Sequence, residues 1–403
     1  MEWKEVRLGD VISFASGGTP SKQKSDYWNG NIPWVSAKAM YVDFISSSDL
    51  FITDLGLANG SKLAPVGTIL LLTRGSGLFN TIPICKVVSP VAFNQDVKCL
   101  FSKDENVLNN DFLFYWLLGN KKLISGILET TGIGAGKIDT TRFLSLSMNL
   151  PSLTEQLRLV KIASSIIEKI ELNNKINAQL EEMAQALFKS WFVDFEPFKD
   201  GKFVESELGM IPEGWRVGTL GEIASITKKS INPQKCPDIV YNHYSLPAYD
   251  ERRYPVLQNG AEIMSNKTVF EGKTTLVSKL NPHIKRVWFV NQVKENPICS
   301  TEFIPIKANN DSYCSFVHCM INSDWFYNKA LSSVNGATTS HQRIHPEDIT
   351  TIKFAMQNEI VLEFCDKVYP FLCKIESNIE ESLHLSHLRD TLLPKLMNGE
   401  IEL

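Results

Sequence analysis

The chain has 403 residues, of which 43% are hydrophobic and 21% charged, and its formal net charge is −4 at pH 7. At roughly 100 to 200 residues per domain, this length corresponds to about two to four domains. The composition is that of a soluble globular protein, and it argues against a disordered, collagenous or membrane chain. The small negative charge argues at first against a nucleic-acid partner, but a net charge is a sum over segments of either sign.

Neither a targeting segment nor a metal motif is evident in the sequence. The first five residues do not resemble a secretory signal, and apolar runs such as 69–72 are too short to span a bilayer. The eight cysteines are scattered, as is typical of a reduced cytoplasmic protein. Cys314, His318 and Cys319 cluster without a second pair at zinc-site spacing. Buried thiols are therefore the favoured interpretation, and no metal is expected.

The chain contains two similar copies in tandem. Four short anchors recur in the same order, at an offset of 212 residues for the first and 205 or 206 for the others. Such an ordered set indicates a duplication. The anchors are Trp3-x4-Leu8-Gly9-Asp10 with Trp215-x4-Leu220-Gly221-Glu222, Gly67-x5-Thr73-Arg74 with Gly272-x5-Ser278-Lys279, Gln95-Asp96-Val97 with Thr301-Glu302-Phe303, and Lys137-Ile138 with Arg343-Ile344.

The first copy is predicted to be an α/β globule followed by a long helix. Residues 1–152 hold short β-rich runs bounded by Gly, Pro or Asn. From Leu153 to about Phe192 there is no Pro or Gly, and apolar residues recur three or four apart, which predicts a helix. Ser152 and Glu155 form a capping-box pattern at its start. The segment 153–199 is therefore assigned to the helix and the start of a Pro- and Gly-rich connector.

The second copy repeats this order. Residues 200–357 are predicted to form a second β-rich globule, and residues 358–403 a second long helix, kinked at Pro370 and ended by Gly399. The fold class is therefore α+β, with two pseudo-repeated α/β globules and two long helices. The expected core of the helix pair consists of Ile162, Ile166, Ile170, Leu180, Leu187, Phe364, Val368, Ile375, Ile379 and Leu392.

Division of the charge among these segments removes the objection to nucleic acid. Residues 1–150 and 200–358 each carry a net charge of +1, residues 151–199 carry −1, and residues 359–403 carry −5. The acidity therefore lies on the helices, whereas both globules are slightly positive.

The sequence shows no convincing catalytic motif, so no catalytic residue and no bound cofactor are assigned. The segment 131–138 resembles a phosphate-binding loop but lacks its first Gly and the Ser/Thr after Lys137. A loose nuclease-like pattern, Asp238 with Glu271 and Lys273, is better explained by a polar turn between strands. Neither Asn232-Pro233 nor Asn281-Pro282 has the second Pro of an amino-methyltransferase loop.

Basic residues in loops are the candidate contacts to nucleic acid, because lysine and arginine bind phosphates and guanine edges. Arg74 and Lys279 are interpreted as equivalent cations at the end of the same strand in both globules, and 279–286 as a basic loop. For each residue alone, ordinary solvated surface is the alternative. The full set is Lys22, Lys24, Arg74, Lys137, Lys228, Lys229, Arg252, Arg253, Lys279, His283, Lys285, Arg286 and Arg343.

A set of short motifs extends over nearly the whole chain. In chain order they are Trp3-x4-Leu8-Gly9-Asp10, Gly18-Thr19-Pro20-Ser21 to Ile32-Pro33-Trp34-Val35, Asn94-Gln95, Pro151-Ser152-Leu153-Thr154-Glu155-Gln156, Ser278-Lys279-Leu280-Asn281-Pro282, Ser300-Thr301-Glu302-Phe303 and Leu392-Leu393-Pro394-Lys395-Leu396. Each motif is short, but their order and the two-helix layout are specific. In these motifs the chain resembles the DNA specificity subunits of type I restriction–modification systems.

This resemblance implies a non-catalytic, cytoplasmic subunit in which two target recognition domains each read one half of a bipartite duplex DNA site. It also implies that the helices pair as an antiparallel coiled coil, set the gap and dock two modification subunits. S-adenosylmethionine would then bind to those subunits, and ATP and Mg to restriction subunits. Leu159, Ile167, Leu172, Trp191 and Phe192 are candidates for that docking, with packing against the adjacent globules as the alternative.

Two other functions remain open at this point. One is a coiled-coil adaptor that joins protein partners without sequence-specific DNA recognition. The other is a single-chain enzyme that methylates or cuts DNA, which the missing motifs disfavour.

Overall fold

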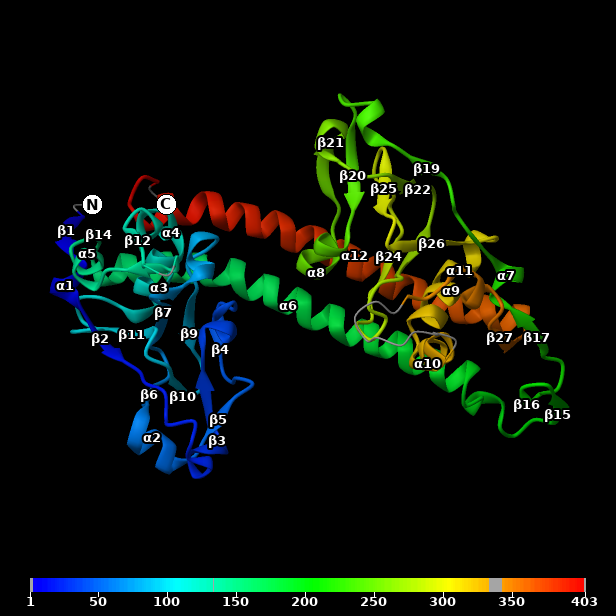
Figure 1. Cartoon of the computed structure of the whole chain (residues 1–403), viewed down its shortest axis with the longest axis horizontal. Coiled ribbons are helices and arrows are strands. Elements are labelled where there is room, and N and C mark those ends of the chain that lie inside the picture. The colour runs from blue at the N-terminus through cyan, green and yellow to red at the C-terminus, as the bar shows by residue number, and fades with distance from the viewer. Residues whose placement is uncertain (1–2, 133, 333–342, 402–403) are drawn as a thin grey trace. The chain divides into compact units, whose positions relative to one another are not determined.

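A computed structural model of the chain describes residues 3–132, 134–332 and 343–401 (Figure 1). The chain divides into two compact units, Met1–Lys169 with His384–Leu403, and Ile170–Leu383. Two 40-residue helices, α6 (Leu153–Phe192) and α12 (Asn358–Met397), contribute to both units. Strand-rich segments precede each helix, which confirms the predicted order of α+β globule and long helix. In the described residues no helix combines the length and apolarity needed to cross a membrane.

The two larger sheets of the first unit have the strand orders β2-β11-β7-β9-β4 and β5-β3-β10-β6, and the pairs β3–β10 and β4–β9 are parallel. Smaller sheets of this unit are formed by β1 with β14 and by β12, β13 and β8. Its strands are β1 (Lys4–Arg7), β2 (Ile12–Ser16), β3 (Trp28–Val35), β4 (Phe44–Ile45), β5 (Phe51–Ile52), β6 (Lys62–Ala64), β7 (Ile69–Leu72), β8 (Arg74–Gly75), β9 (Ile84–Val87), β10 (Val91–Phe93), β11 (Val97–Ser102), β12 (Leu128–Thr130), β13 (Gly136–Ile138) and β14 (Ser147–Leu150). Its short helices are α1 (Leu8–Val11), α2 (Asp54–Gly60), α3 (Asn110–Gly119), α4 (Lys121–Ser125) and α5 (Thr140–Leu144).

The second unit repeats this arrangement, with strand orders β18-β26-β23-β24 and β19-β22-β25-β20-β21 and one parallel pair, β20–β25. Its strands are β15 (Phe203–Ser206), β16 (Gly209–Pro212), β17 (Arg216–Thr219), β18 (Ala224–Ile226), β19 (Ser230–Ile231), β20 (Val240–Tyr244), β21 (Val256–Asn259), β22 (Lys267–Val269), β23 (Thr274–Ser278), β24 (Val287–Val290), β25 (Pro297–Ser300), β26 (Phe303–Ala308) and β27 (Lys353–Met356). Its short helices are α7 (Leu220–Ile223), α8 (Leu246–Arg252), α9 (Cys314–Asn322), α10 (Asp324–Ser332) and α11 (Pro346–Thr350).

Strand register shows the duplication more accurately than the sequence anchors do. Val97 pairs with Leu72 in the first unit, and Phe303 pairs with Ser278 in the second, so the offset is 206 residues on both strands. The expected equivalence of Arg74 with Lys279 is therefore wrong by one residue. The anchors Gly67 and Gly272 both have positive φ, +85° and +70°, and the extra residue lies between this glycine and the strand.

The two long helices run antiparallel within the second unit. Phe188 of α6 packs on Phe364 of α12, with ring centroids 6.1 Å apart. Earlier in α6, the buried Asn173 and Asn177 contact the later residue Asn378, whose Nδ2 donates to Asn177 Oδ1 at 2.8 Å. Buried asparagines satisfy one another only in a matching register, so they favour one axial alignment of the helices.

The enclosed stripe of each helix differs in part from the predicted core. Phe364, Val368 and Ile375 are buried, as predicted. The other predicted core residues are only half-buried: Ile162, Ile166, Ile170, Leu180, Leu187, Ile379 and Leu392. The fully buried positions of α6 are Gln156, Leu159, Ala163, Ile167, Asn173, Asn177, Ala184, Phe188 and Phe192. The stripe is displaced because α6 packs on a globule as well as on α12, and because it includes polar residues that apolar periodicity does not detect.

Burial also decides which of the five candidates for docking a modification subunit are accessible. Leu159 and Ile167 lie in the core of the first unit, and Phe192 lies in the core of the second with Trp191 packed against it. Of the five candidates, Leu172 alone is exposed, at 51%. The alternative, packing against the adjacent globules, is therefore correct for the other four.

The ends of the helices follow the sequence signals. Ser152 Oγ accepts a hydrogen bond from the backbone N–H of Glu155 at 3.4 Å, as the capping pattern predicts. Helix α12 ends at Met397, and Gly399 takes a φ of +74°, which glycine adopts without strain. The helix continues through Pro370, where a kink was expected.

Candidate nucleic-acid interface

In the first unit, three chain segments meet where strand β7 ends. The backbone N–H of Thr73 donates to the carbonyl oxygen of Asp96 at 2.7 Å, and that of Ile138 donates to Thr73 at 2.9 Å. Arg74 and Lys137 face each other as Cα partners in the pair β8–β13. We call this group of Thr73, Arg74, Asp96 and Lys137 the first junction. It brings together two cations that the sequence predicted separately.

The second unit has the same backbone arrangement 206 residues later. The N–H of Lys279 donates to Glu302 O at 2.8 Å, the N–H of Ile344 donates to Lys279 O at 3.2 Å, and Leu280 bridges to Arg343. We call Lys279, Leu280, Glu302 and Arg343 the second junction. Two predicted cations meet here as well.

The two junctions share a frame but differ in most side chains. By register, Thr73 corresponds to Lys279 and Arg74 to Leu280. An acid (Asp96 or Glu302) and a cation (Lys137 or Arg343) occur at the same place in both. Next to the shared acid, Gln95 and Lys98 in the first unit correspond to Thr301 and Ile304 in the second. The same scaffold therefore presents two different chemical surfaces.

A glycine loop lies against the first junction. The N–H of Gly18 donates to Phe93 O at 2.9 Å, and Thr19 Oγ1 donates to Gln95 Oε1 at 2.5 Å. A Cβ on Gly17 would come within 2.1 Å of Phe93 O, so this approach requires glycine. The predicted cations Lys22 and Lys24 follow on the same loop and are exposed, with Lys24 Nζ donating to Tyr27 Oη at 3.0 Å.

A cavity of about 260 Å³ beside the second junction brings one more predicted cation, Lys228, close to Lys279. Lys228 and Lys279 both line it, along with Thr268 and Thr301. Lys279 Nζ donates to Thr301 O at 2.7 Å, which directs the ammonium group toward the turn before β26. Lys229 and His283 are exposed nearby in sequence but do not line this cavity.

The predicted basic loop 279–286 does not act as one group. Lys285 pairs with Asp324 at 3.0 Å, and Arg286 forms a two-bonded pair with Asp250 at 2.6 and 2.8 Å. The dipeptide Arg252-Arg253 is divided in the same way, because Arg252 pairs with the adjacent Glu251 at 3.5 Å whereas Arg253 pairs with Glu181 of α6. DNA contact by these four cations stays an untested prediction.

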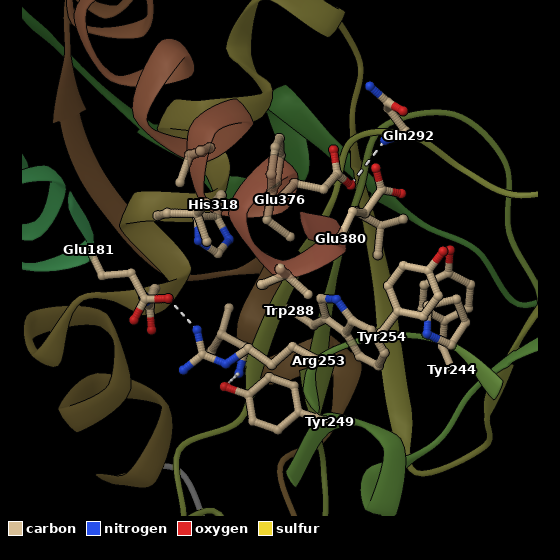
Figure 2. Close-up of a pocket in the computed structure, with 18 of the residues that line it drawn as sticks. Glu181, Tyr244, Tyr249, Arg253, Tyr254, Trp288, Gln292, His318, Glu376 and Glu380 are labelled. Atoms are coloured by element: carbon tan, nitrogen blue, oxygen red, sulfur yellow. Dashed lines mark hydrogen bonds and ion pairs between the residues drawn. The ribbon is translucent and has the colours of Figure 1, made fainter. Parts of the chain in front are cut away.

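A second cavity, of about 410 Å³, lies where the β-rich part of the second unit meets its helix segments (Figure 2). Its charged groups bind one another. Arg253 pairs with Glu181, Lys294 pairs with Glu380, and Glu376 Oε1 accepts the N–H groups of Asn291 and Gln292 at 3.1 and 3.2 Å. These contacts fasten the globule to both helices, with Tyr244, Tyr249, Tyr254 and Trp288 forming the aromatic wall.

Comparison with known proteins shows which family this chain resembles. Residues 1–182 match the family model described as the type I restriction modification DNA specificity domain. The MjaIX specificity subunit of Methanocaldococcus jannaschii, a type I restriction enzyme subunit, is 29% identical over 423 residues, which cover 99% of this chain and 94% of that protein. The chain is therefore similar over nearly its whole length to a type I restriction enzyme specificity subunit, and residues 1–182 match the DNA specificity domain of that family.

Two further relatives agree. The EcoR124I/EcoR124II specificity subunit of Escherichia coli is 33% identical over 164 residues, which cover 40% of each chain. The crystal structure of the S subunit from M. genitalium has a TM-score of 0.58 at 15% identity and covers 98% of this chain and 96% of that one, which shows a shared fold. The adaptor without DNA recognition is not favoured by these similarities.

The site includes residues that the sequence prediction missed. Lys98, on β11, donates to Ser16 Oγ at 2.6 Å beside the first junction. Burial lowers its pKa, and the nearby Arg74 lowers it further, whereas Asp96 opposes both. The sequence signal that could have identified Lys98 is its position as a charged residue inside the apolar run 97–102. In the sequence the junction acids Asp96 and Glu302 stand out only as repeat anchors, because an acidic residue is not expected to contact a polyanion.

The cluster Cys314, His318 and Cys319 lies on the buried helix α9. No group of three or more His, Cys, Asp or Glu side chains suited to a metal ion occurs in the described part of the chain. All eight cysteines are free, and six of them are buried. Burial, together with the smaller effects of Arg253 and Lys285, lowers the pKa of His318 to about 3, so its imidazole is neutral in the folded protein at neutral pH.

The depressed pKa of His318 predicts a loss of stability in acid. Below pH 6.5 the unfolded chain binds a proton at this residue and the folded chain does not, so folding stability falls until the pH reaches the folded pKa. Between pH 6.5 and 5 this amounts to about 2 kcal/mol. Urea denaturation of His318→Gln across this range should show a correspondingly flatter pH dependence. The exposed His283 is the control, and an equally flat profile for His283→Asn would contradict the assignment.

Proposed function

We propose that this chain is a specificity subunit that recognises a bipartite duplex DNA sequence, with each unit reading one half. The observation that carries the proposal is the pair of junctions. One backbone arrangement is used twice, yet all six compared positions carry different residues, and only the acid and one cation keep their charge in both units. A protein that recognised the same half-sequence twice would need identical side chains in both junctions. Two different surfaces instead suit two different half-sequences.

The chemistry of the junctions supports contact with DNA. Arg74, Lys137, Lys279 and Arg343 offer guanidinium and ammonium groups, which bind phosphates and the O6 and N7 acceptors of guanine. Gln95 and Thr301, at the matching turn position, add neutral hydrogen-bonding groups of different length. Cations would position the duplex, and the side chains that differ would discriminate bases.

The long helices are proposed to set the distance between the half-sites and to dock two modification subunits. Their antiparallel pairing within the second unit and the matched asparagines Asn177 and Asn378 support a fixed axial alignment of the two helices there. Leu172 and Met183 of α6 are exposed at 51% and 50% and are available to a protein partner. Isolated exposed apolar groups are weak evidence, so docking rests mainly on the similarity to specificity subunits.

Catalysis is proposed to belong to partner subunits, with the chain itself acting as a non-catalytic, cytoplasmic component. Methylation would take place on the modification subunits, which would bind S-adenosylmethionine. ATP-driven cleavage, with Mg, would belong to restriction subunits. The similarity to specificity subunits supports this division of labour, and the chain's own residues are required only to bind DNA and partners.

Footprinting of the full chain with its methyltransferase partner tests the function. We expect two protected tracts separated by an unprotected gap, on a duplex identified by methylome sequencing of a host with the complete system. Lys279→Ala should weaken one tract only, by about tenfold in affinity, which is the size of one or two lost charge contacts. Lys202→Ala is the matched control, because Lys202 is an exposed lysine of the same unit that is not among the candidate contacts. Equal loss in both tracts would contradict independent reading by the two units.

Salt dependence separates DNA recognition from the adaptor function. Binding through phosphates must weaken steeply as salt rises, because condensed counterions are released. A chain whose affinity for partners is unaffected by salt and which shows no protected tract would be an adaptor.

A further inference from the structure

A carboxylate occupies the same place in both junctions. Asp96 and Glu302 lie in the turns that precede β11 and β26, and the carbonyl oxygen of each accepts a backbone hydrogen bond from the end of the neighbouring strand. Among the compared positions, only this acid and the cation Lys137 or Arg343 keep their charge in both units. An acid is unexpected on a surface that binds a polyanion, so its presence in both frames requires an explanation.

The second junction shows what the carboxylate does in the free protein. Glu302 Oε1 accepts a hydrogen bond from Arg343 Nη2 at 3.0 Å. The other oxygen, Oε2, is enclosed and has no hydrogen-bond partner among the described residues. The side chain is 28% exposed, so water screens its charge only in part. The acid therefore neutralises Arg343 while keeping unused capacity to accept a hydrogen bond.

The first junction has the same balance of charges with different partners. Asp96 accepts a long hydrogen bond from Gln95 Nε2 at 3.4 Å, and its charge raises the pKa of Lys98 against the effects of burial and of Arg74. Here too, one carboxylate acts electrostatically on neighbouring cations of the reading surface. The effect is common to both units although the cations differ.

We propose that Asp96 and Glu302 are specificity-determining residues. Each weakens non-specific binding at its junction, because a phosphate must displace the acid from a cation and approach a like charge. In the correct half-site each accepts a hydrogen bond from the exocyclic amino group of adenine or cytosine, the donors that carboxylates read in the major groove. The inference rests on the proposed function and assigns these two acids a role within it.

The test compares Glu302→Gln with Glu271→Gln in the full chain with its methyltransferase partner. Glutamine keeps the hydrogen bond to Arg343 and removes the charge, and the exposed Glu271 lies beyond the other end of β23. The probes are the methylome-defined duplex and a shuffled duplex of equal length and composition. For Glu302→Gln we expect tighter binding to the shuffled duplex, with a salt slope steeper by about 0.9, and about a tenfold lower specificity ratio.

Asp96→Asn should act in the same way on the other half-site, and it provides a second variant if Glu302→Gln folds poorly. If wild-type protein protects two tracts but Glu302→Gln and Asp96→Asn both match Glu271→Gln, the inference is overturned and the proposed function stands. An equal loss of affinity for both duplexes would also overturn it, because the acids would then be purely structural. Absence of two tracts in the wild type would overturn the proposed function itself.

Discussion

Inserting four residues into each long helix is expected to lengthen the gap between the two DNA half-sites by roughly two base pairs. Four helical residues add about 6 Å along the axis, and one base pair adds about 3.4 Å. Each half-sequence should remain unchanged, because the junctions lie in the globules. Affinity for the original duplex should fall by about a thousandfold, toward the non-specific level, since only one half-site can engage at a time.

The structure determines where the insertions belong. Insertion near Asn174, close to the middle of α6, would separate Asn173 and Asn177 from each other while both contact Asn378. Placing one insertion after Lys169 and the other before His384 follows the division between the compact units and preserves the contacts inside each.

The measurement is a series of affinities for duplexes whose gaps differ by single base pairs. The control is four residues inserted in the connector after Asp200, outside both helices. If the optimal gap stays the same in the helix variant, or if the connector variant changes it equally, the helices do not set the distance.

Much of the fold could be predicted from the sequence because its signals are local and repeated. The absence of Pro and Gly between Leu153 and Phe192 gave a helix with those same bounds. The recurrence of short anchors revealed the duplication. Register could not be obtained this way, because an extra residue between Gly272 and its strand shifts the alignment by one, and only the pairing of Phe303 with Ser278 corrects it.

The site was predicted less completely than the fold. Positive charge identified Arg74, Lys137, Lys279 and Arg343, which the chain brings together in pairs. Charge could not show that Arg286 would be engaged by Asp250, since the two residues are distant in sequence. Charge also could not single out Asp96 and Glu302, because only the strand register shows that the two acids occupy equivalent positions in the two junctions.

The core predicted for the helix pair was correct only in part. Periodicity selected Ile162 and Ile166 because it assumes a single apolar partner. In the folded chain α6 packs on a globule and on α12 together, so a different stripe, including Leu159 and Ala163, is the most enclosed. Asn173 and Asn177 are buried because both make polar contacts with Asn378 of α12, which a count of apolar residues cannot detect.

Replacing Phe364 by alanine is expected to destabilise the second unit by about 3 to 5 kcal/mol, the usual cost of deleting a buried phenylalanine ring. Phe364 is 0% exposed and lies at the centre of an aromatic cluster. Its ring centroid is 5.2 Å from that of Phe192, 6.0 Å from Trp191 and 6.2 Å from Phe316. Three elements, α6, α9 and α12, meet at this side chain, so the cavity left by alanine cannot close by movement of one of them.

Urea denaturation combined with hydrogen exchange measures this effect and locates it. Amides of α9 should lose protection in Phe364→Ala, whereas those of β7 and β11 in the first unit should keep it, because the two cores are separate clusters. The control is Leu362→Ala, which removes a side chain that is 39% exposed on the same helix and should cost no more than about 0.5 kcal/mol. A Phe364→Ala protein as stable as this control would show that the aromatic cluster does not hold the globule on the helices. The ion pairs Arg253–Glu181 and Lys294–Glu380 would then have to hold the globule on the helices without the aromatic cluster.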